Sequence, residues 1–395
     1  IVDYMLDKNN DATTPPSSYD LRNVDGKNYI TPVRNQGSLG ICWTFASAGA
    51  AESYLLKQND LTYQSNSLLI SERQMDYATS VDGIKDYDNE YVSFIERNLG
   101  EGGNIYISSI AMANGISLID YNTFKEFNDR DLEPMELNDI LSYKNSLYEL
   151  NSTINMPYLN DRESTDDLTT KELFKKLNHQ YKIKNNIINY GAAYVSTNVN
   201  NSCVYTDSKL NNVVVDVYKC STYGGGHAME IIGWDDNIEY SYCADKNKHV
   251  ANTTNCSNIV KGKGVWILKN SWGDNTQYPY LTYDSLYTGV SFITEMSKTS
   301  EKNWDNNYIL GLETQGKTNG EYKLSDTKIK KTEKLKKIKF IGETSDTTYT
   351  IKILKNDGTY ENITKNVSLP GLFTVDIDTD VLVDKDSKFF IETEG

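Results

Sequence analysis

The sequence predicts an α+β protein that is followed by an all-β sandwich, and three observations indicate this class. Residues 42–58 are rich in alanine and other strong helix formers, and helix-like segments continue to residue 115. After Gly191, short runs of β-branched and aromatic residues take their place. Beyond residue 297, apolar and polar residues alternate between turn signals such as "NDG". Helices that precede strands in this way predict segregated α and β regions.

The individual elements follow from periodicity and residue type. In "CWTFASAGAAESYLLKQ" the apolar residues recur at helical spacing, so we expect a buried helix that begins near Cys42. Residues 128–180 are charged and broken, and we expect only short helical stretches there, such as 170–180. The expected elements are helices at 42–58, 68–80 and 104–115, strands at 192–199, 227–236, 264–272 and 291–297, and sandwich strands at 307–313, 334–343, 347–358 and 388–395.

Shifts in composition divide the chain into three parts. Residues 1–14 are polar and unpatterned, and we interpret them as a tail or the remnant of a pro-segment. They do not have the basic start and apolar stretch of a signal peptide, so we expect that an export signal has been trimmed. Residues 15–296 contain a higher density of apolar residues, and we expect them to form the α+β domain. Residues 297–395 begin with a polar bridge and form the sandwich, which need not be complete at its C-terminal end.

The charge of the chain argues against a nucleic-acid partner. The formal net charge is −15, and a nucleic-acid binder would present a basic face. The chain contains no run of about 18 apolar residues, so no membrane span is expected. A lysine run at 328–339 could bind an anion, but Leu335, Ile338 and Phe340 show strand-like patterning. We therefore expect these lysines to line a solvated face.

The five cysteines predict an oxidising compartment. Four of them form two close pairs in polar, loop-like stretches, and Cys42 stands apart. An odd count of this kind suggests two local disulfides, Cys203–Cys220 and Cys243–Cys256, and one free thiol. Disulfides persist in exported proteins, so we expect a secreted, cell-wall or cell-surface location. The alternative is a cytosolic protein with five reduced thiols, because spacing alone does not determine pairing.

Cys42 has the surroundings of a reactive thiol. A thiol becomes a good nucleophile when it ionises, and a helix N-terminus or a nearby imidazolium lowers its pKa. Three histidines are available. His179 lies in a charged helical stretch and His249 lies in a loop, whereas His227 stands where "GGG" leads into an apolar strand. His227 is therefore the expected partner, and the alternatives are a buried, inert cysteine and a structural histidine.

Two further side chains complete the expected chemistry. An imidazole needs a partner that fixes its tautomer, and Asn270 ends another predicted strand, with Trp272 available to shield the contact from water. Acyl transfer also needs donors for an oxyanion. The backbone amide of Cys42 is one donor, and the side-chain amide of Gln36, across a glycine-containing loop, is the second.

Three blocks, "TPVRNQGSLGICWTFAS", "GGGHAMEIIGW" and "KNSWG", together resemble the papain family of cysteine peptidases over residues 15–295. The resemblance implies a two-lobed fold with a helical left lobe and a β-rich right lobe, and no required cofactor. It implies that Cys42 is the nucleophile and His227 the general acid–base. It also implies that Asn270 orients the imidazole and that Gln36 completes the oxyanion hole.

The same resemblance suggests substrate contacts. "GEGGNIY" resembles the glycine pair of the family that hydrogen-bonds the substrate backbone, although a plain turn is the alternative. The implied substrate-binding residues are Gly40, Gly102, Gly103, Asn104, Ala193, Ala228 and Trp272. The chain departs from the family at Leu39, where most members carry a cysteine, and in long gaps between the three blocks.

The C-terminal part resembles the lectin-like domain that follows the peptidase domain in cell-wall cysteine proteases of clostridia. Relatives of that kind process surface-layer or adhesin proteins. Such sandwiches sometimes hold a structural calcium, for which Asp305, Asp376 and Asp378 are candidate ligands, although acidic residues on an acidic protein are usually just solvated. Sugar binding does not follow from the shape of a fold.

The sequence therefore predicts a thiol endopeptidase, made as a zymogen, that acts on protein or peptide substrates of the bacterial surface or of a host, with cell-wall glycan or surface-layer protein as further partners. One alternative is a peptidoglycan amidase, which would cut muropeptides. The other is a catalytically silent adhesin with a glycan-binding sandwich, which would bind without turnover.

Overall fold

The structure is a computed structural model that describes residues 14–66, 68–85, 97–123, 133–136, 146–156, 170–200, 203–216, 226–245, 255–273, 277–286, 289–310 and 320–394. The chain forms two compact units. The first contains residues up to 69 and 156–292, and the second contains 70–155 and 293–395. The units do not follow the expected division at residue 297, because two helices from the N-terminal half join the second unit. The domain boundaries themselves stay a prediction.

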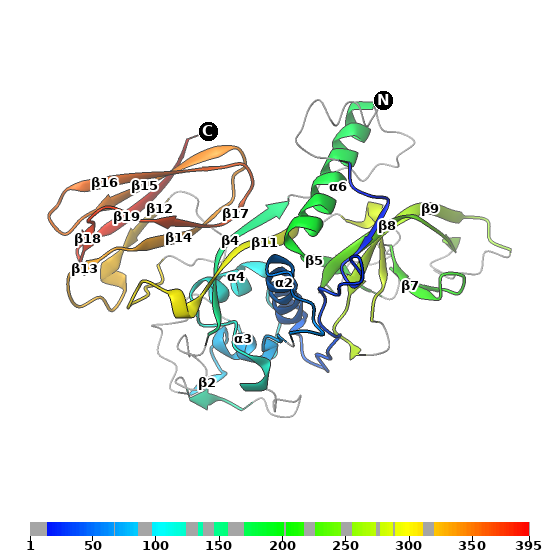
Figure 1. Ribbon diagram of the computed structural model, residues 1–395, viewed down its shortest axis with the longest axis horizontal. Coiled ribbons are helices and arrows are strands. Elements are labelled where there is room, and N and C mark those ends of the chain that lie inside the picture. The colour runs from blue at the N-terminus through cyan, green and yellow to red at the C-terminus, as the bar shows by residue number, and fades with distance from the viewer. Residues whose placement is uncertain are drawn as a thin grey trace. The chain divides into compact units, whose positions relative to one another are not determined.

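A buried helix lies at the centre of the first unit. Helix α2 (Cys42–Gln58) begins and ends where the sequence predicts, and almost all of its side chains are buried. It packs against strands β5 (Ala193–Asn198) and β8 (Gly226–Cys243) and against helix α6 (Thr170–Tyr190). Figure 1 shows α2 and α6 beside these strands. The position of Cys42 therefore depends on a helix held on several sides.

An extended sheet carries the rest of the first unit. Its strand order is β11-β5-β8-β9-β10-β7-β6, and β1 pairs with β8. The neighbours are antiparallel except for the parallel pair β7 and β10. The remaining strands are β1 (Ser18–Asp20), β6 (Val204–Asp207), β7 (Asn212–Val215), β9 (Ile259–Lys269), β10 (Tyr280–Thr282) and β11 (Val290–Lys298).

The disulfide prediction is confirmed where the structure describes it. Cys243, at the end of β8, is bonded to Cys256 across the loop that leads to β9. Cys203 is also disulfide-bonded, and its predicted partner Cys220 lies outside the described residues. Cys42 is the free cysteine among the described residues.

The second unit combines two short helices with a β-sandwich. Helices α3 (Glu72–Ala78) and α4 (Ile105–Ala113) lie near strand β4 (Tyr148–Met156), which pairs with the later part of β11. The small strands β2 (Ile84–Lys85) and β3 (Met135–Glu136) pair in parallel. Among the described residues, 3-10 turns lie at Tyr121–Thr123, Tyr283–Ser285, Thr299–Glu301 and Leu324–Asp326.

The predicted sandwich is present. One sheet has the order β12-β19-β15-β16, and two-stranded sheets β14-β17 and β13-β18 face it (Figure 1). Alternate residues of β15, such as Tyr349, Ile351 and Ile353, point into the shared core. The strands are β12 (Gly320–Lys323), β13 (Glu333–Lys334), β14 (Lys337–Gly342), β15 (Thr347–Leu354), β16 (Tyr360–Val367), β17 (Gly371–Asp376), β18 (Leu382–Val383) and β19 (Lys388–Glu394).

The structure corrects two expectations for the sandwich region. Residues 307–310 are not a strand, and the rest of the expected strand at 307–313 lies outside the described residues. The lysines of β14 do not line a solvated face. Lys337 Nζ lies 3.1 Å from the buried carboxylate of Glu149 on β4, and Lys339 donates to the backbone oxygens of Ala113 and Leu150. Because both sides of β14 are covered, its outward residues still have protein neighbours.

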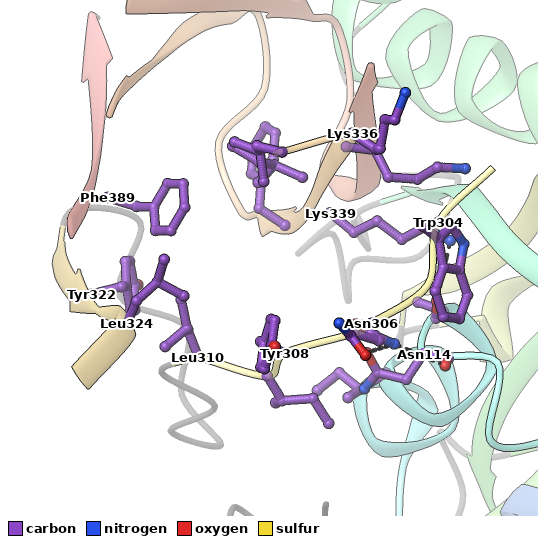
Figure 2. Close-up of a pocket in the computed structure, with 18 of the residues that line it drawn as sticks. Asn114, Trp304, Asn306, Tyr308, Leu310, Tyr322, Leu324, Lys336, Lys339 and Phe389 are labelled. Atoms are coloured by element: carbon purple, nitrogen blue, oxygen red, sulfur yellow. Dashed lines mark hydrogen bonds between the residues drawn. The ribbon is translucent and has the colours of Figure 1, made fainter. Parts of the chain in front are cut away.

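The second unit also encloses a cavity of about 540 Å³. Helix α4, residues 303–310 and the open end of the sandwich line it, among the described residues. Figure 2 shows Trp304, Tyr308, Leu310 and Phe389 arranged around the hollow, with Asn114, Asn306 and Lys336 at its edge. Apolar and aromatic side chains line this cavity together with many asparagines and charged residues, and its volume is in the range that small ligands occupy.

Candidate active site

Backbone N–H groups surround the sulfur of Cys42. The preceding residue, Ile41, provides no side-chain cap to α2, so the first amides of the helix stay directed at the thiol. The amides of Cys42 and Trp43 both lower the pKa of this thiol. From β8, the amide of Ala228 lies 3.4 Å from Sγ. These donors stabilise negative charge on the sulfur or on an oxygen bound beside it.

The imidazole of His227 is held in one tautomer. Its Nε2 atom lies 2.7 Å from Oδ1 of Asn270, and the same oxygen accepts the N–H of Ser271 at 2.8 Å. Because an amide oxygen accepts and cannot donate, Nε2 carries the ring hydrogen. Nδ1 is then the atom that can take a proton from the thiol. The predicted role of Asn270 agrees with this geometry.

Trp272 covers the contact between His227 and Asn270. Its ring stacks on the imidazole with centroids 4.6 Å apart and planes at 24°. The segment that carries Trp272 is tied to the loop before α2 by a bridge with Asn35 and by the hydrogen bond from Gln36 N to Ser271 O, at 2.8 Å. The second and third sequence blocks therefore lie against the first.

Gln36 is buried, and both ends of its side-chain amide have partners. Nε2 donates to the carbonyl of Leu39 at 2.8 Å, and Oε1 accepts the hydroxyl of Ser271 at 2.6 Å. The contact with the carbonyl of Leu39, which can only accept, fixes which end of the amide is the nitrogen. Nε2 carries two hydrogens, and Leu39 takes one of them. The predicted oxyanion role therefore depends on the second hydrogen of the same nitrogen.

Burial opposes the ionisation of each catalytic group taken singly. Burial raises the pKa of the Cys42 thiol, and backbone donors partly offset this. Burial also lowers the pKa of His227, although the hydrogen bond to Asn270 acts in the other direction. A proton that passes from sulfur to ring creates both charges together, and their attraction opposes the desolvation cost. The thiolate–imidazolium pair therefore stays a prediction.

Two of the predicted pocket residues lie on the paired strands β5 and β8. Ala228 pairs with Ser196, and its backbone amide lies 3.4 Å from the sulfur of Cys42. Ala193 pairs with Ile231 and is fully buried, four positions along β5 from Thr197, which pairs with His227. Residues an even number of positions apart on a strand share a face of the sheet, so Ala193 lies on the face that carries His227. The substrate-binding role of both alanines stays a prediction.

The other predicted substrate contacts are described within their own units. Gly40 is exposed, two residues before Cys42. Gly102 and Gly103 are exposed in the second unit, and a Cβ at Gly102 would meet no atom within 4 Å. Asn104 caps α4, and its Oδ1 accepts the amides of Tyr106 and Ile107. Their substrate-binding role stays a prediction.

Sequence reasoning missed several residues behind the catalytic ones. Ser271 is one of these, and its place inside the "NSWG" block was the available signal. Tyr194 on β5 is buried, and the charge of Cys42 contributes to the rise of its pKa. Four charged residues that are largely or wholly buried also meet at α2, and they are Arg34, Glu52, Glu230 and Lys269. No sequence pattern indicated that these four would meet.

Among the described residues, the one group with three close cysteine or acidic ligand atoms is Cys243, Asp245 and Cys256, and its two cysteines form a disulfide. Asp305, Asp376 and Asp378 are not part of a group of this kind in the described part of the chain, and calcium binding stays a prediction. Within the part of the chain that the structure describes, no helix has the length and apolar character needed to cross a bilayer.

Comparison with known sequences supports the predicted resemblance. Residues 15–100 match the family model of the papain family cysteine proteases. Cathepsin K of Mus musculus is 54% identical over 43 residues, which are 11% of this chain and 12% of that protein. The chain thus matches only a small part of this relative.

Comparison with solved structures covers almost the whole chain. The cysteine protease and lectin-like domains of Cwp84, a surface layer associated protein of Clostridium difficile, align with a TM-score of 0.62 and 16% identity, over 96% of this chain and 75% of that one. Clostridial Cwp84 after propeptide cleavage aligns with a TM-score of 0.58 and 15% identity, over 95% and 82%. The fold is that of a papain-like cysteine peptidase with a further β-rich domain, as the sequence predicts.

Proposed function

We propose that this chain is a secreted or surface-located endopeptidase that hydrolyses peptide bonds through an acyl-enzyme on Cys42. One observation supports this above all. The Nε2 atom of His227 is fixed on Asn270 at 2.7 Å, while the amide of the next residue, Ala228, lies 3.4 Å from the Cys42 sulfur. A nucleophile, an oriented base and amide donors therefore occur together in one unit, as acyl transfer requires.

The proposed reaction uses these groups in two stages. His227 Nδ1 takes the thiol proton, and Sγ attacks the carbonyl carbon of the scissile bond. The backbone amide of Cys42 and Nε2 of Gln36 donate to the oxyanion. His227 then gives its proton to the leaving amine, and a thioester remains on Cys42. A water molecule, deprotonated by His227, hydrolyses the thioester and restores the thiol.

Replacement of the nucleophile tests this proposal. Cys42→Ala should abolish hydrolysis of peptide libraries, and wild-type activity should rise as the thiolate forms and fall as His227 loses its proton. Retained hydrolysis in the variant, or a flat profile between about pH 4 and pH 9, would contradict the mechanism. Release of muropeptides in place of peptides would favour an amidase. Surface-protein cleavage by the wild type would support the proposed location.

For the partner of the β-rich region we propose a cell-wall glycan, bound in the cavity of the second unit. The cavity combines aromatic rings with asparagine amides, as Trp304, Tyr308 and Asn306 show in Figure 2, and this combination suits sugar rings. Tyr106 also lines the cavity. Tyr106 is 40% exposed, so its ring is accessible. This feature also favours the alternative of an adhesin, which would bind glycan without any turnover.

Glycan fragments and the intact chain can test this second site. Tyr106→Ala should weaken binding of purified cell-wall glycan by about tenfold, because a stacked ring contributes about 1 kcal/mol or more. Tyr360→Ala is the matched control, because its ring is 51% exposed on β16 and does not line the cavity. Equal binding by both variants would place the glycan elsewhere.

A further inference from the structure

Four charged side chains form a buried cluster in the first unit. Arg34 Nη2 lies 2.6 Å from Oε1 of Glu52, and Lys269 Nζ lies 3.5 Å from Oε2 of Glu230. Glu52 and Glu230 are both almost wholly removed from solvent. Buried charges are expensive to keep unless they are paired, so a cluster of this kind holds its segments together through the pairing.

Each member of the cluster comes from a segment that also carries a catalytic residue. Arg34 is two residues before Gln36, and Glu52 is on α2 with Cys42. Glu230 follows His227 on β8, and Lys269 directly precedes Asn270 on β9. Glu230 and Lys269 are also Cα partners in the ladder between these strands. The cluster therefore connects the four segments whose alignment the proposed reaction needs.

Helix α2 makes room for Glu230 at a single position. A Cβ added at Gly49 would lie 1.2 Å from Oε1 of Glu230. Because residue 49 is glycine, the carboxyl group of Glu230 occupies the space that the side chain of any other amino acid at position 49 would fill. The helix of the nucleophile and the strand of the imidazole therefore touch through Glu230.

The surroundings of Glu230 make its charge sensitive to pH. Burial raises its pKa to about 7, and the charge of Glu52 adds to this, while Lys269 and Arg34 act against it. Tyr194, its partner on β5, and the nearby Tyr278 complete the titratable groups that face it. Neither carboxylate oxygen has a hydrogen-bond partner within the described part of the chain.

A small cavity adjoins both this carboxyl group and the site. Its volume is about 10 Å³, and its lining includes Glu230, Lys269, Ala228, Asn270 and Ser271. The side chain of Glu230 therefore has a little space toward the residues that hold His227. When the charge of Glu230 changes, its side chain can shift slightly into this cavity, whereas closely packed parts of a protein core resist such movement.

We propose that Glu230 is a positioning residue for His227 and Asn270, and that the loss of its proton draws Lys269 and the adjoining Asn270 out of the aligned arrangement. In the uncharged state Lys269 keeps its hydrogen bond to Thr31 Oγ1, at 3.0 Å. In the charged state the attraction of Glu230 competes with that bond. The inference rests on the proposed function, and it predicts that activity declines above neutral pH for a reason other than the titration of His227.

Glu230→Gln in the full chain tests the proposal, because glutamine mimics the uncharged acid. Two readouts are taken across pH, namely kcat/KM on a peptide and the rate of Cys42 alkylation by iodoacetamide. At pH 6 the variant and the wild type should agree within about twofold. At pH 8.5 the variant should be about threefold or more faster in both readouts. If the variant and the wild type lost activity and alkylation rate in the same way above neutral pH, the proposal would be overturned.

The controls separate positioning from stability and from the proposed function. Glu149→Gln removes an equally buried, lysine-paired carboxyl group from the other unit, and its pH profile should match the wild type. If Glu230→Gln does not fold, the double variant Gly49→Ala/Glu230→Ala replaces it. This variant also has no carboxyl group at position 230, so the same higher rates are expected at pH 8.5. Alkylation of Cys42 does not require peptide hydrolysis, so it tests this inference even if the chain cleaves no peptide.

Discussion

At the scale of single residues, one oxygen atom sets the tautomer of the His227 imidazole. Asn270 Oδ1 accepts from Ser271 N and faces His227 Nε2. Asn270→Ala removes this acceptor and releases the ring to change its tautomer. A lost hydrogen bond to a buried group costs about 1–2 kcal/mol, so kcat should fall about tenfold with little change in KM. Steady-state kinetics on one peptide measures the effect.

A second asparagine in the same unit provides the control. Asn212 on β7 donates to the carbonyl of Tyr278, away from the catalytic residues. Asn212→Ala should leave kcat as it is, although stability can fall. If Asn270→Ala also kept the full kcat, the ring of His227 would be held by other contacts and the role given to Asn270 would be wrong.

Glu230 should also make the stability of the fold depend on pH. Its pKa is raised from 4.5 to about 7, so in this range the folded state keeps a proton that the unfolded state has lost. The free energy of unfolding should therefore fall as pH rises from about 4.5 to about 7, by at most about 3 kcal/mol, and stay low above it. Urea unfolding of Glu230→Gln should show a much flatter dependence. An unchanged slope would mean that Glu230 is ionised throughout.

At the scale of elements, the sequence predicted those whose pattern is local. Helix α2 has the predicted limits because its alanine-rich sequence favours a helix and suits a buried one. Helix α6 was expected only in part, since charged residues on its exposed face break the apolar run, yet it is one helix of 21 residues. Strand β4 was missed because "YELNSTINM" is polar, and the hydroxyl groups of Ser152 and Thr153 find partners within the second unit, on Thr294 and on the amide of Leu372.

A buried lysine helps to anchor helix α6 to the sheet of the first unit. Lys184 is buried, its Nζ lies 2.8 Å from Asp236 Oδ1, and the same atom is 4.8 Å from the ring centroid of Tyr283. Lys184→Met keeps the apolar stem and removes the charge. Since Asp236 is 38% exposed and stays solvated, we expect a loss of only about 2 kcal/mol in the free energy of unfolding.

Chemical denaturation of this variant beside Lys182→Met tests the anchor. Lys182 is on the same helix and is only half-buried, so its replacement should change stability by less than about 0.5 kcal/mol. Equal midpoints for the two variants would show that the ion pair and the aromatic contacts of Lys184 do not hold α6.

At the scale of the whole molecule, the sequence could predict features that depend on short local segments. It could not predict contacts between segments that lie far apart along the chain. The proposed catalytic residues Cys42, His227 and Asn270 stand in three sequence blocks that resemble those of a known family, so their roles could be predicted without coordinates. The partners of Glu230 and Glu149 could not, because they come from segments that only folding brings together. For the same reason the lysines of β14 were expected in water and instead meet a buried carboxylate.

That carboxylate gives a prediction about how the two compact units unfold. Glu149 on β4 faces Lys337 and Lys339 of β14, at 3.1 and 3.7 Å, and accepts from Trp304 Nε1 at 3.2 Å. Burial already lowers the pKa of Lys339 to about 8. Glu149→Gln leaves both lysines without their counter-charge, which costs about 3–5 kcal/mol when a buried pair is broken.

Glu149→Gln should destabilise the second unit and leave the first unit as stable as before. The two units should then unfold separately, and urea unfolding should show two transitions and not a single two-state transition. Hydrogen exchange should speed up in residues 146–156 and 337–342 and stay slow in 226–243. Uniform loss of protection would instead mean that the chain unfolds as one cooperative body, whatever the division of its contacts. If the chain unfolds as one body, Glu149→Gln would also slow peptide hydrolysis near the melting temperature of the variant, because the first unit would unfold with the second. At low temperature, hydrolysis would be unchanged whether or not the units unfold together.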